Sequence, residues 1–120
     1  IQYAHARLSN ILEHAINKGF DLEHLDENNI LYNTPDELEL LRKVARMPGI
    51  IEIAARTRQP HLMAFYLLEL ARIFHPFYFK NRIVSDDIEM TNKRLVLSLA
   101  LKQIFKKGLS LLGISAPTNM

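Results

Sequence analysis

A tyrosine and an arginine lie four residues apart near the start of the chain, in the segment YAHAR, which runs from Tyr3 to Arg7. If the segment is helical, both side chains leave the same face, because residues i and i+4 are neighbours on a helix. A phenol ring beside a guanidinium group can stack on an unpaired nucleobase and bind a phosphate. The pair therefore fits a single-stranded RNA ligand. A core aromatic residue beside a solvated cation is the alternative, and it stays open at this point.

A second group of aromatic and basic residues occurs in FHPFYFKNR, where aromatic side chains precede Lys80 and Arg82. We expect Phe74 and Phe77 to lie in the core, because they belong to a stretch that is apolar on most of its helical faces. For Tyr78 the same two interpretations stand as for the YAHAR pair: a contact with RNA or a place in the core.

Residues able to catalyse a reaction are not recognisable. The chain has no cysteine, no glycine-rich phosphate loop and no serine in a nucleophile motif. The histidines lack the spacing of metal ligands, so we expect each to be a surface or hydrogen-bonded residue: His5, His14, His24, His61 and His75. We predict neither a catalytic residue nor a metal site in these 120 residues.

Charge is distributed unevenly along the chain, although the net charge is only +2. Residues 1–41 contain eight acids and two bases, whereas residues 42–120 contain thirteen bases and five acids. This asymmetry favours a polyanionic partner on one side of the domain, although lysines that merely solvate a helix face would also explain it. The candidate phosphate contacts after Met90 are Lys93, Arg94, Lys102, Lys106 and Lys107.

The size and composition of the chain indicate one globular domain with 48% apolar residues. No apolar run approaches the ~20 residues that span a bilayer. The absence of cysteine fits a reducing compartment. Ile1 in place of a methionine suggests a piece of a longer protein.

Hydrophobic periodicity and breaker residues predict helices over residues 1–18, 35–46, 49–57, 60–80 and 88–112. Thr34, Pro35 and Glu37 form a start signal with a capping box, and Asp86 or Ser85 is the expected cap of the last helix. Pro76 is expected to kink or end its helix. Residues 21–33 are predicted to form a loop with at most a short helical turn. The fold class is therefore an all-α bundle of about five helices.

Four segments together resemble the C-terminal anticodon-binding domain of arginyl-tRNA synthetases, a helical domain with the so-called DALR signature. They are YAHAR, ELELLRKVARMP, AARTRQPHLMAFYLLELARIFHPFY and the terminal GLSLLGISAP, which two further residues separate from the last methionine. The resemblance covers residues 1–120, in order, and implies one DALR-type domain whose catalytic domain lies outside this chain.

The resemblance implies that the bundle binds the anticodon loop of arginine tRNA and reads its central cytosine. Carried over by motif, Tyr3 and Arg7 would lie at the anticodon pocket and Tyr78 would stack on a loop base. The terminal methionine would be Met120, beside the bound RNA. The basic residue that follows the aromatic run, Arg82, completes the predicted RNA-binding set.

The resemblance also implies partners: arginine tRNA and the catalytic domain of the same chain, but neither a membrane nor DNA. ATP and Mg would serve the full-length arginine-tRNA ligase in the cytoplasm, with no cofactor in this fragment. Two alternatives remain at this point. One is the equivalent tRNA-binding domain of another aminoacyl-tRNA synthetase, and the other is a helical protein-interaction module.

Overall fold

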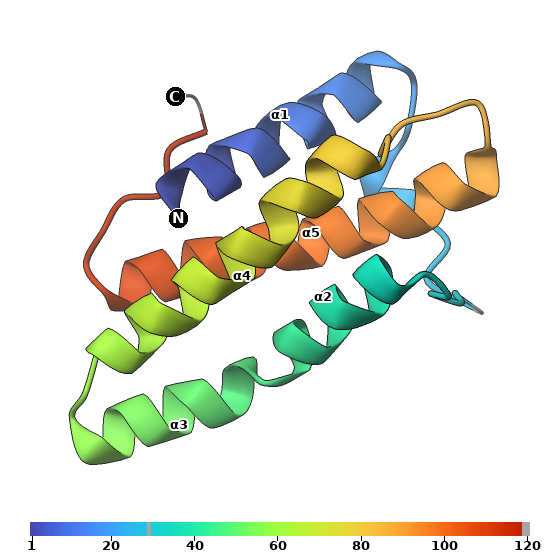
Figure 1. Cartoon of the computed structure of the whole chain (residues 1–120). Coiled ribbons are helices and arrows are strands. Elements are labelled where there is room, and N and C mark those ends of the chain that lie inside the picture. Colours follow the sequence, from blue (N-terminus) through green and yellow to red (C-terminus); the bar gives the residue numbers. More distant parts are fainter. Residues whose placement is uncertain (29, 119–120) are drawn as a thin grey trace.

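A computed structural model describes residues 1–28 and 30–118, and Figure 1 shows the path of the chain. This part of the chain contains α1 (Gln2–Asn17), the 3-10 helix η1 (Leu22–His24), α2 (Pro35–Ala45), α3 (Met47–Thr57), α4 (His61–Lys80) and α5 (Ile88–Leu111). No strand occurs among the described residues, and none of their helices has the length and apolarity to cross a membrane. The predicted all-α bundle and the short helical turn in residues 21–33 are confirmed.

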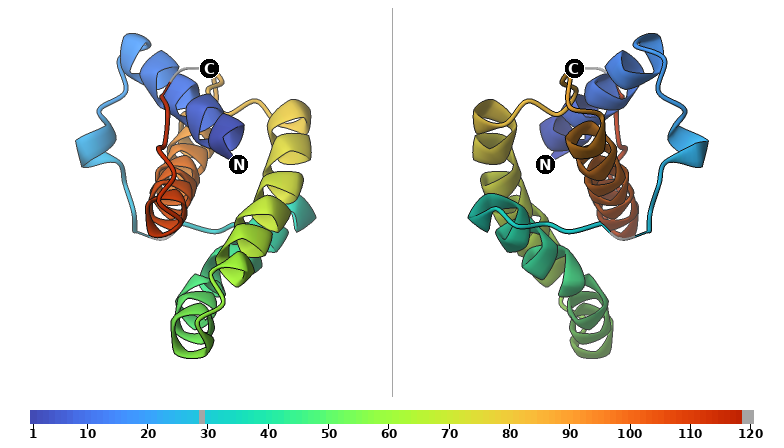
Figure 2. Two further views of the ribbon diagram at one scale, coloured as in Figure 1. Left: turned by 90° about the vertical axis from the view of Figure 1, so that its left-hand side faces the viewer. Right: turned by 90° about the vertical axis from the view of Figure 1, so that its right-hand side faces the viewer.

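The helices form two groups: one consists of α1 and α5, and the other of α4 with α2 and α3. Helices α1 and α5 lie side by side, while α4 separates them from α2 and α3 (Figures 1 and 2). The contact between α4 and α5 forms the centre of the core. Its largest fully buried side chains from these two helices are Leu67, Leu70, Phe74, Leu95, Leu101, Phe105 and Leu109.

The predicted capping box starts α2. The Thr34 hydroxyl accepts a hydrogen bond from the Glu37 amide at 3.3 Å, and the Glu37 carboxylate accepts one from the Thr34 amide at 3.4 Å. Pro35 occupies the first turn, where its missing N–H costs nothing. Pro48 plays the same part in α3, so α2 ends at Ala45 and the next helix begins almost at once.

Pro76, expected to interrupt its helix, lies inside α4, which runs past it to Lys80. A proline in a helix removes the hydrogen bond to the carbonyl four residues earlier, here that of Arg72. Both Pro76 and Arg72 are exposed, so water can bind the released carbonyl. Phe74 and Phe77 are buried on the opposite side of the helix and anchor both of its parts in the core. The expectation of a helix end at this point is therefore wrong.

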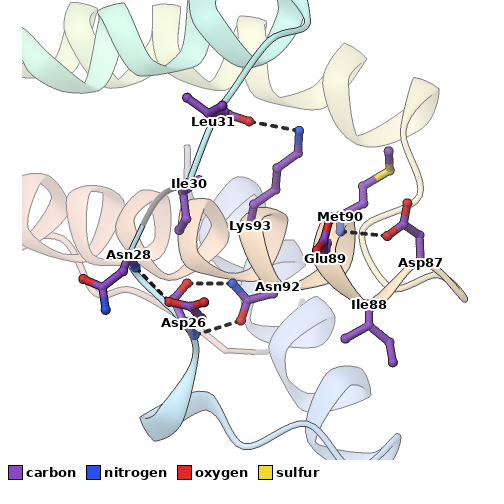
Figure 3. A pocket seen from close by; sticks show the side chains of 10 residues that line it. All are labelled: Asp26, Asn28, Ile30, Leu31, Asp87, Ile88, Glu89, Met90, Asn92 and Lys93. Carbon is purple, nitrogen blue, oxygen red and sulfur yellow. Dashed lines mark hydrogen bonds between the residues drawn. The ribbon is translucent and has the colours of Figure 1, made fainter.

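The start of α5 also differs from the prediction. Its N-cap is Asp87, whose carboxylate accepts a hydrogen bond from the Met90 amide at 3.1 Å (Figure 3). Asp86 does not cap the helix, and the Ser85 hydroxyl accepts from the Asp87 amide at 3.3 Å instead. The cap thus lies one residue later than the nearer of the two expected positions.

Replacing Asp87 by alanine is expected to lower the free energy of unfolding by about 1 kcal/mol, because the α5 amide then loses its capping acceptor. Asp86→Ala is the matched control, since it removes a neighbouring carboxylate that caps nothing. Urea denaturation followed by circular dichroism measures both variants. Equal losses in the two would mean that general charge, and not the cap, is responsible.

Gly108 lies within α5, beside Leu67 of α4. A Cβ atom at this position would come within 2.6 Å of the Leu67 Cδ1 atom. Leu67 is fully buried and cannot easily move aside. The glycine, unfavourable for a helix in itself, is therefore explained by the contact between the two helices.

Candidate nucleic-acid interface

The guanidinium group of Arg7 lies among three aromatic rings between α1 and α4. Its Cζ atom is 4.6 Å from the ring centroid of Tyr3, 4.5 Å from that of Tyr78 and 4.8 Å from that of Phe79. Two hydrogen bonds fix its orientation: Nη1 to His75 Nδ1 at 3.0 Å and Nη2 to the Tyr3 hydroxyl at 3.2 Å. We call these five residues the Arg7 cluster.

Helical spacing on two helices explains why the cluster forms. Tyr3 and Arg7 are four residues apart on α1, and His75 and Phe79 are four residues apart on α4. The two helices run in the same general direction (Figure 1), so Tyr3 meets His75 while Arg7 lies nearer the end of α4. The ring centroids of Tyr3 and His75 are 5.9 Å apart.

Two rings of the cluster present open surface to solvent. Tyr3 is 49% exposed and Phe79 is 74% exposed, whereas Phe77 is buried in the core as expected. Tyr78 is half-buried, with its ring 6.2 Å from that of Phe74. The cluster therefore combines exposed aromatic faces with a guanidinium held in place, as stacking on an unpaired base requires.

His75 is uncharged in this arrangement. Burial lowers the pKa of its imidazole below the ordinary value of 6.5, and the positive charge of Arg7 lowers it further. The hydrogen bond agrees with this, because a guanidinium group can only donate and Nδ1 must accept. The neutral ring therefore carries its proton on Nε2.

We expect His75 to titrate below pH 6.5 and to titrate at higher pH after Arg7→Ala, which removes an opposing charge. Because the unfolded chain takes up this proton more readily, the associated stability is lost as the pH falls below about 6.5. NMR titration of the imidazole signals measures the effect. Arg56→Ala, which removes an arginine of α3, is the control. An unchanged titration after Arg7→Ala would contradict the assignment.

A surface pocket of about 500 Å³ continues beyond the cluster along the same two helices. Arg82, which follows α4, is exposed and lies in its wall. The pocket is shared between α1 and the end of α4, and its other lining residues are Asn10, Ile11, His14, Tyr78, Phe79, Asn81, Ile83 and Val84. Polar and aromatic groups therefore continue for two further turns of α1.

The structure brings together three of the residues selected from sequence, Tyr3, Arg7 and Tyr78, and it places Arg82 on the adjoining pocket. Met120 lies outside the described residues.

Of the two other members of the cluster, His75 escaped the sequence reasoning, and Phe79 was recognised only as part of the aromatic run in FHPFYFKNR. A usable signal existed, because the two are separated by four residues, the same spacing that pointed to the pair in YAHAR.

The buried side chain of Arg94 fixes the segment that carries Arg82. Its Nη1 donates to the Arg82 carbonyl at 3.0 Å, and its Nη2 donates to the Asn81 side-chain oxygen at 3.2 Å. Its Nε lies 3.5 Å from a carboxylate oxygen of Glu37. Arg94 is only 6% exposed and Glu37 is fully buried. The expectation that Arg94 contacts phosphate is therefore wrong, since its charge is neutralised inside the fold.

Glu37 remains charged despite its burial. Burial raises the pKa of its carboxyl group, but hydrogen bonds with Thr34 and the charge of Lys93 lower it more, so the net pKa falls below 4.5. The carboxylate thereby joins α2 to α5. Through Arg94 it also supports the backbone at the edge of the candidate site.

Lys93 is engaged in the same region and is a poor candidate for phosphate. Its Nζ lies 3.4 Å from Glu37 and donates to the Leu31 carbonyl at 3.3 Å (Figure 3). It lines a pocket of about 580 Å³ at the start of α5, whose acidic residues would repel a phosphate: Asp26, Asp87 and Glu89.

The segment after α5 turns back along α1 (Figure 1). Gln2 Nε2 donates to the Ser115 carbonyl at 3.0 Å, and His5 Nδ1 lies 2.7 Å from the Pro117 carbonyl oxygen. Thr118 lines a further pocket against α1. The first helix and the last described residues of the chain therefore lie side by side.

Comparison with known proteins gives one family. A family model described as "DALR anticodon binding domain" matches residues 1–120. Curated relatives include an arginine–tRNA ligase of Geobacter metallireducens, 41% identical over 121 residues, and one of Acinetobacter baumannii, 40% identical over 122 residues. The matches cover all of this chain but 22% and 20% of those proteins, so the chain spans about a fifth of their length.

A crystal structure is also similar. It is described as that of a proposed arginyl tRNA synthetase from Campylobacter jejuni, and it superposes with a TM-score of 0.77 at 28% sequence identity. The match covers 99% of this chain and 25% of that one. Sequence and fold comparisons thus agree over the entire bundle.

Proposed function

The chain belongs to the DALR anticodon binding domain family, and from this premise we propose that it binds the anticodon loop of arginine tRNA and reads its central cytosine. In the whole protein the domain serves a cytoplasmic arginine-tRNA ligase. A catalytic domain of the same chain uses ATP and Mg to attach arginine at the far end of the tRNA. The names of the relatives and the family match support this assignment.

The observation that carries the proposal is the Arg7 cluster. Its exposed rings, Tyr3 and Phe79, provide stacking surfaces for bases that leave the loop, and each stacked base contributes about 1–3 kcal/mol. Its guanidinium is already oriented by two hydrogen bonds, so little conformational freedom is lost when RNA binds.

Arg7 also provides a reason for a preference for cytosine. The guanidinium has five N–H donors and no acceptor, and two of its donors are used by Tyr3 and His75. Cytosine presents adjacent acceptors at O2 and N3, which suit the remaining donors. Uracil carries a proton on N3, so a donor would face a donor, and an unmet buried group costs about 1–3 kcal/mol.

Exposed cations supply attraction for the backbone phosphates. Arg82 borders the adjoining pocket, and Lys106 and Lys107 are exposed on α5. The last two diverge by ~100° around the helix, so one RNA strand need meet only one of them. Each phosphate contact releases counterions, so binding should weaken steeply as salt rises.

Titration of the chain with an arginine-tRNA anticodon stem-loop tests the proposal. We expect binding to weaken about tenfold or more when the central cytosine is replaced by uracil. Phe79→Ala should weaken binding to the cytosine loop by a similar factor, because a stacking surface is lost. Phe65→Ala is the matched control, since Phe65 is an exposed aromatic residue at the other end of α4. Equal affinity for the two loops would overturn cytosine reading by this domain.

A further inference from the structure

We propose that His5 is a positioning residue that holds the segment 114–118 against α1. It thereby fixes the position of this segment beside the RNA-binding face, which is the surface formed by the Arg7 cluster and the adjoining pocket. The consequence for RNA rests on the proposed function. The attachment of the segment to α1 is a property of the fold and can be measured without RNA.

In the part of the chain that the structure describes, the His5 ring has one hydrogen bond, and it goes to this segment. The side chain is 2% exposed, and its Nδ1 lies 2.7 Å from the carbonyl oxygen of Pro117. A carbonyl oxygen only accepts, so Nδ1 carries the proton and Nε2 is bare in the neutral ring. Nε2 is buried and has no hydrogen-bond partner among the described residues. Within residues 1–28 and 30–118, the bond to Pro117 is thus the one polar interaction that compensates for burying this imidazole.

The segment also packs against the core through Ala116, but it has few other polar contacts with α1. Beyond Gly113 it is not helical, and in the described part of the chain its other hydrogen bond to α1 is the one from Gln2 to Ser115. That bond is exposed, so water competes with it. The bond of His5 is shielded more from water, so it is the stronger of the two attachments.

The position of Asn10 on α1 links the attached segment to the RNA-binding face. Thr118 and Asn10 line one pocket, and Asn10 also lines the pocket that contains Tyr78 and Phe79. Asn10 therefore lies between the pocket at the attached segment and the pocket beside the Arg7 cluster. His5, between Tyr3 and Arg7 in the sequence, lies on the opposite side of the same helix, so α1 carries the attached segment on one side and the Arg7 cluster on the other.

Two conservative substitutions separate the attachment from simple burial. The Nδ2 donor of asparagine lies near the position of histidine Nδ1, whereas the Nε2 donor of glutamine lies near that of histidine Nε2. We therefore expect His5→Asn to keep the segment attached and His5→Gln to release it. The heteronuclear ¹⁵N NOE of the Ala116 and Thr118 amides reports attachment, and circular dichroism confirms that each variant is folded.

The ¹⁵N shifts of the imidazole provide a second readout in the unmodified chain, which should show the proton on Nδ1. A proton on Nε2, or a segment as rigid in His5→Gln as in the unmodified chain, would overturn the attachment. Gln2→Ala is the control on the same helix, and it should change the NOE less than His5→Gln.

The RNA measurement then tests the consequence. We expect His5→Gln to weaken binding of the cytosine stem-loop about tenfold, with His5→Asn close to the unmodified chain. A segment that is released without loss of affinity would overturn the role in RNA binding and leave the proposed function intact. An unmodified chain that does not distinguish cytosine from uracil would instead overturn the proposed function, and with it this role, while the NOE still decides the attachment.

Discussion

Replacing Arg7 by alanine is expected to weaken binding of the arginine-tRNA anticodon stem-loop by roughly 30-fold or more. The substitution removes the donors that we propose to face the cytosine. It also removes the group that holds Tyr3, Tyr78 and Phe79 together, because the guanidinium lies 4.5–4.8 Å from all three ring centroids. Fluorescence titration at fixed salt measures the loss, which should be much smaller for the uracil loop.

Two further variants define what Arg7 contributes. Arg7→Lys keeps the charge but loses the planar set of donors, so an intermediate loss is expected. Arg72→Ala removes an exposed arginine of α4 that lines a different pocket, together with Asp36 and Glu39. If Arg72→Ala weakened binding as much as Arg7→Ala, general charge would explain the affinity and the cluster would not.

Replacing Glu37 by alanine is expected to lower the free energy of unfolding by about 3–5 kcal/mol, because it leaves the buried charge of Arg94 without its partner. Single domains are stable by only about 5–15 kcal/mol, so the variant should be close to unfolding at room temperature. Urea denaturation measures the change. Glu39→Ala, which removes an exposed acid of the same helix, is the control and should cost little.

The loss of stability at low pH provides a second test of the contribution of Glu37. Since the folded pKa of Glu37 is below 4.5, its contribution is fully present above pH 4.5 and is lost as the pH falls through the folded pKa. In the Glu37→Ala variant, this part of the loss of stability with falling pH should be absent. Replacing Glu37 and Arg94 together by leucine and methionine should restore much of the stability but not the support of Arg82. A double variant as unstable as Glu37→Ala would show that the unpaired charge is not the cause.

Local rules were enough to predict the helices and, within the candidate site, the pair of Tyr3 and Arg7. The capping box at Thr34 and the i, i+4 pair of Tyr3 and Arg7 depend only on neighbours along the chain, and both occur as predicted. The same is true of Phe74 and Phe77, whose burial follows from the apolar periodicity of α4.

The residues that were predicted wrongly or missed depend on contacts between segments that are distant in the sequence. Arg94 has the composition of a surface cation, and nothing within α5 indicates that Glu37, 57 residues away, neutralises it. Pro76 follows the usual rule for a helix breaker, but the buried residues on either side of it keep α4 continuous. The role of His75 also depends on Arg7, which comes from another helix.

The place of the Arg7 cluster, between a helix of one group and a helix of the other, has a consequence for unfolding. Arg7 comes from α1 and its partners His75, Tyr78 and Phe79 come from α4, so any opening that separates these helices abolishes the site. An RNA that contacts both helices would therefore oppose their separation. At 100 times its dissociation constant it would add about 2.7 kcal/mol to stability, and amide hydrogens far from the RNA, on both helices, would exchange more slowly.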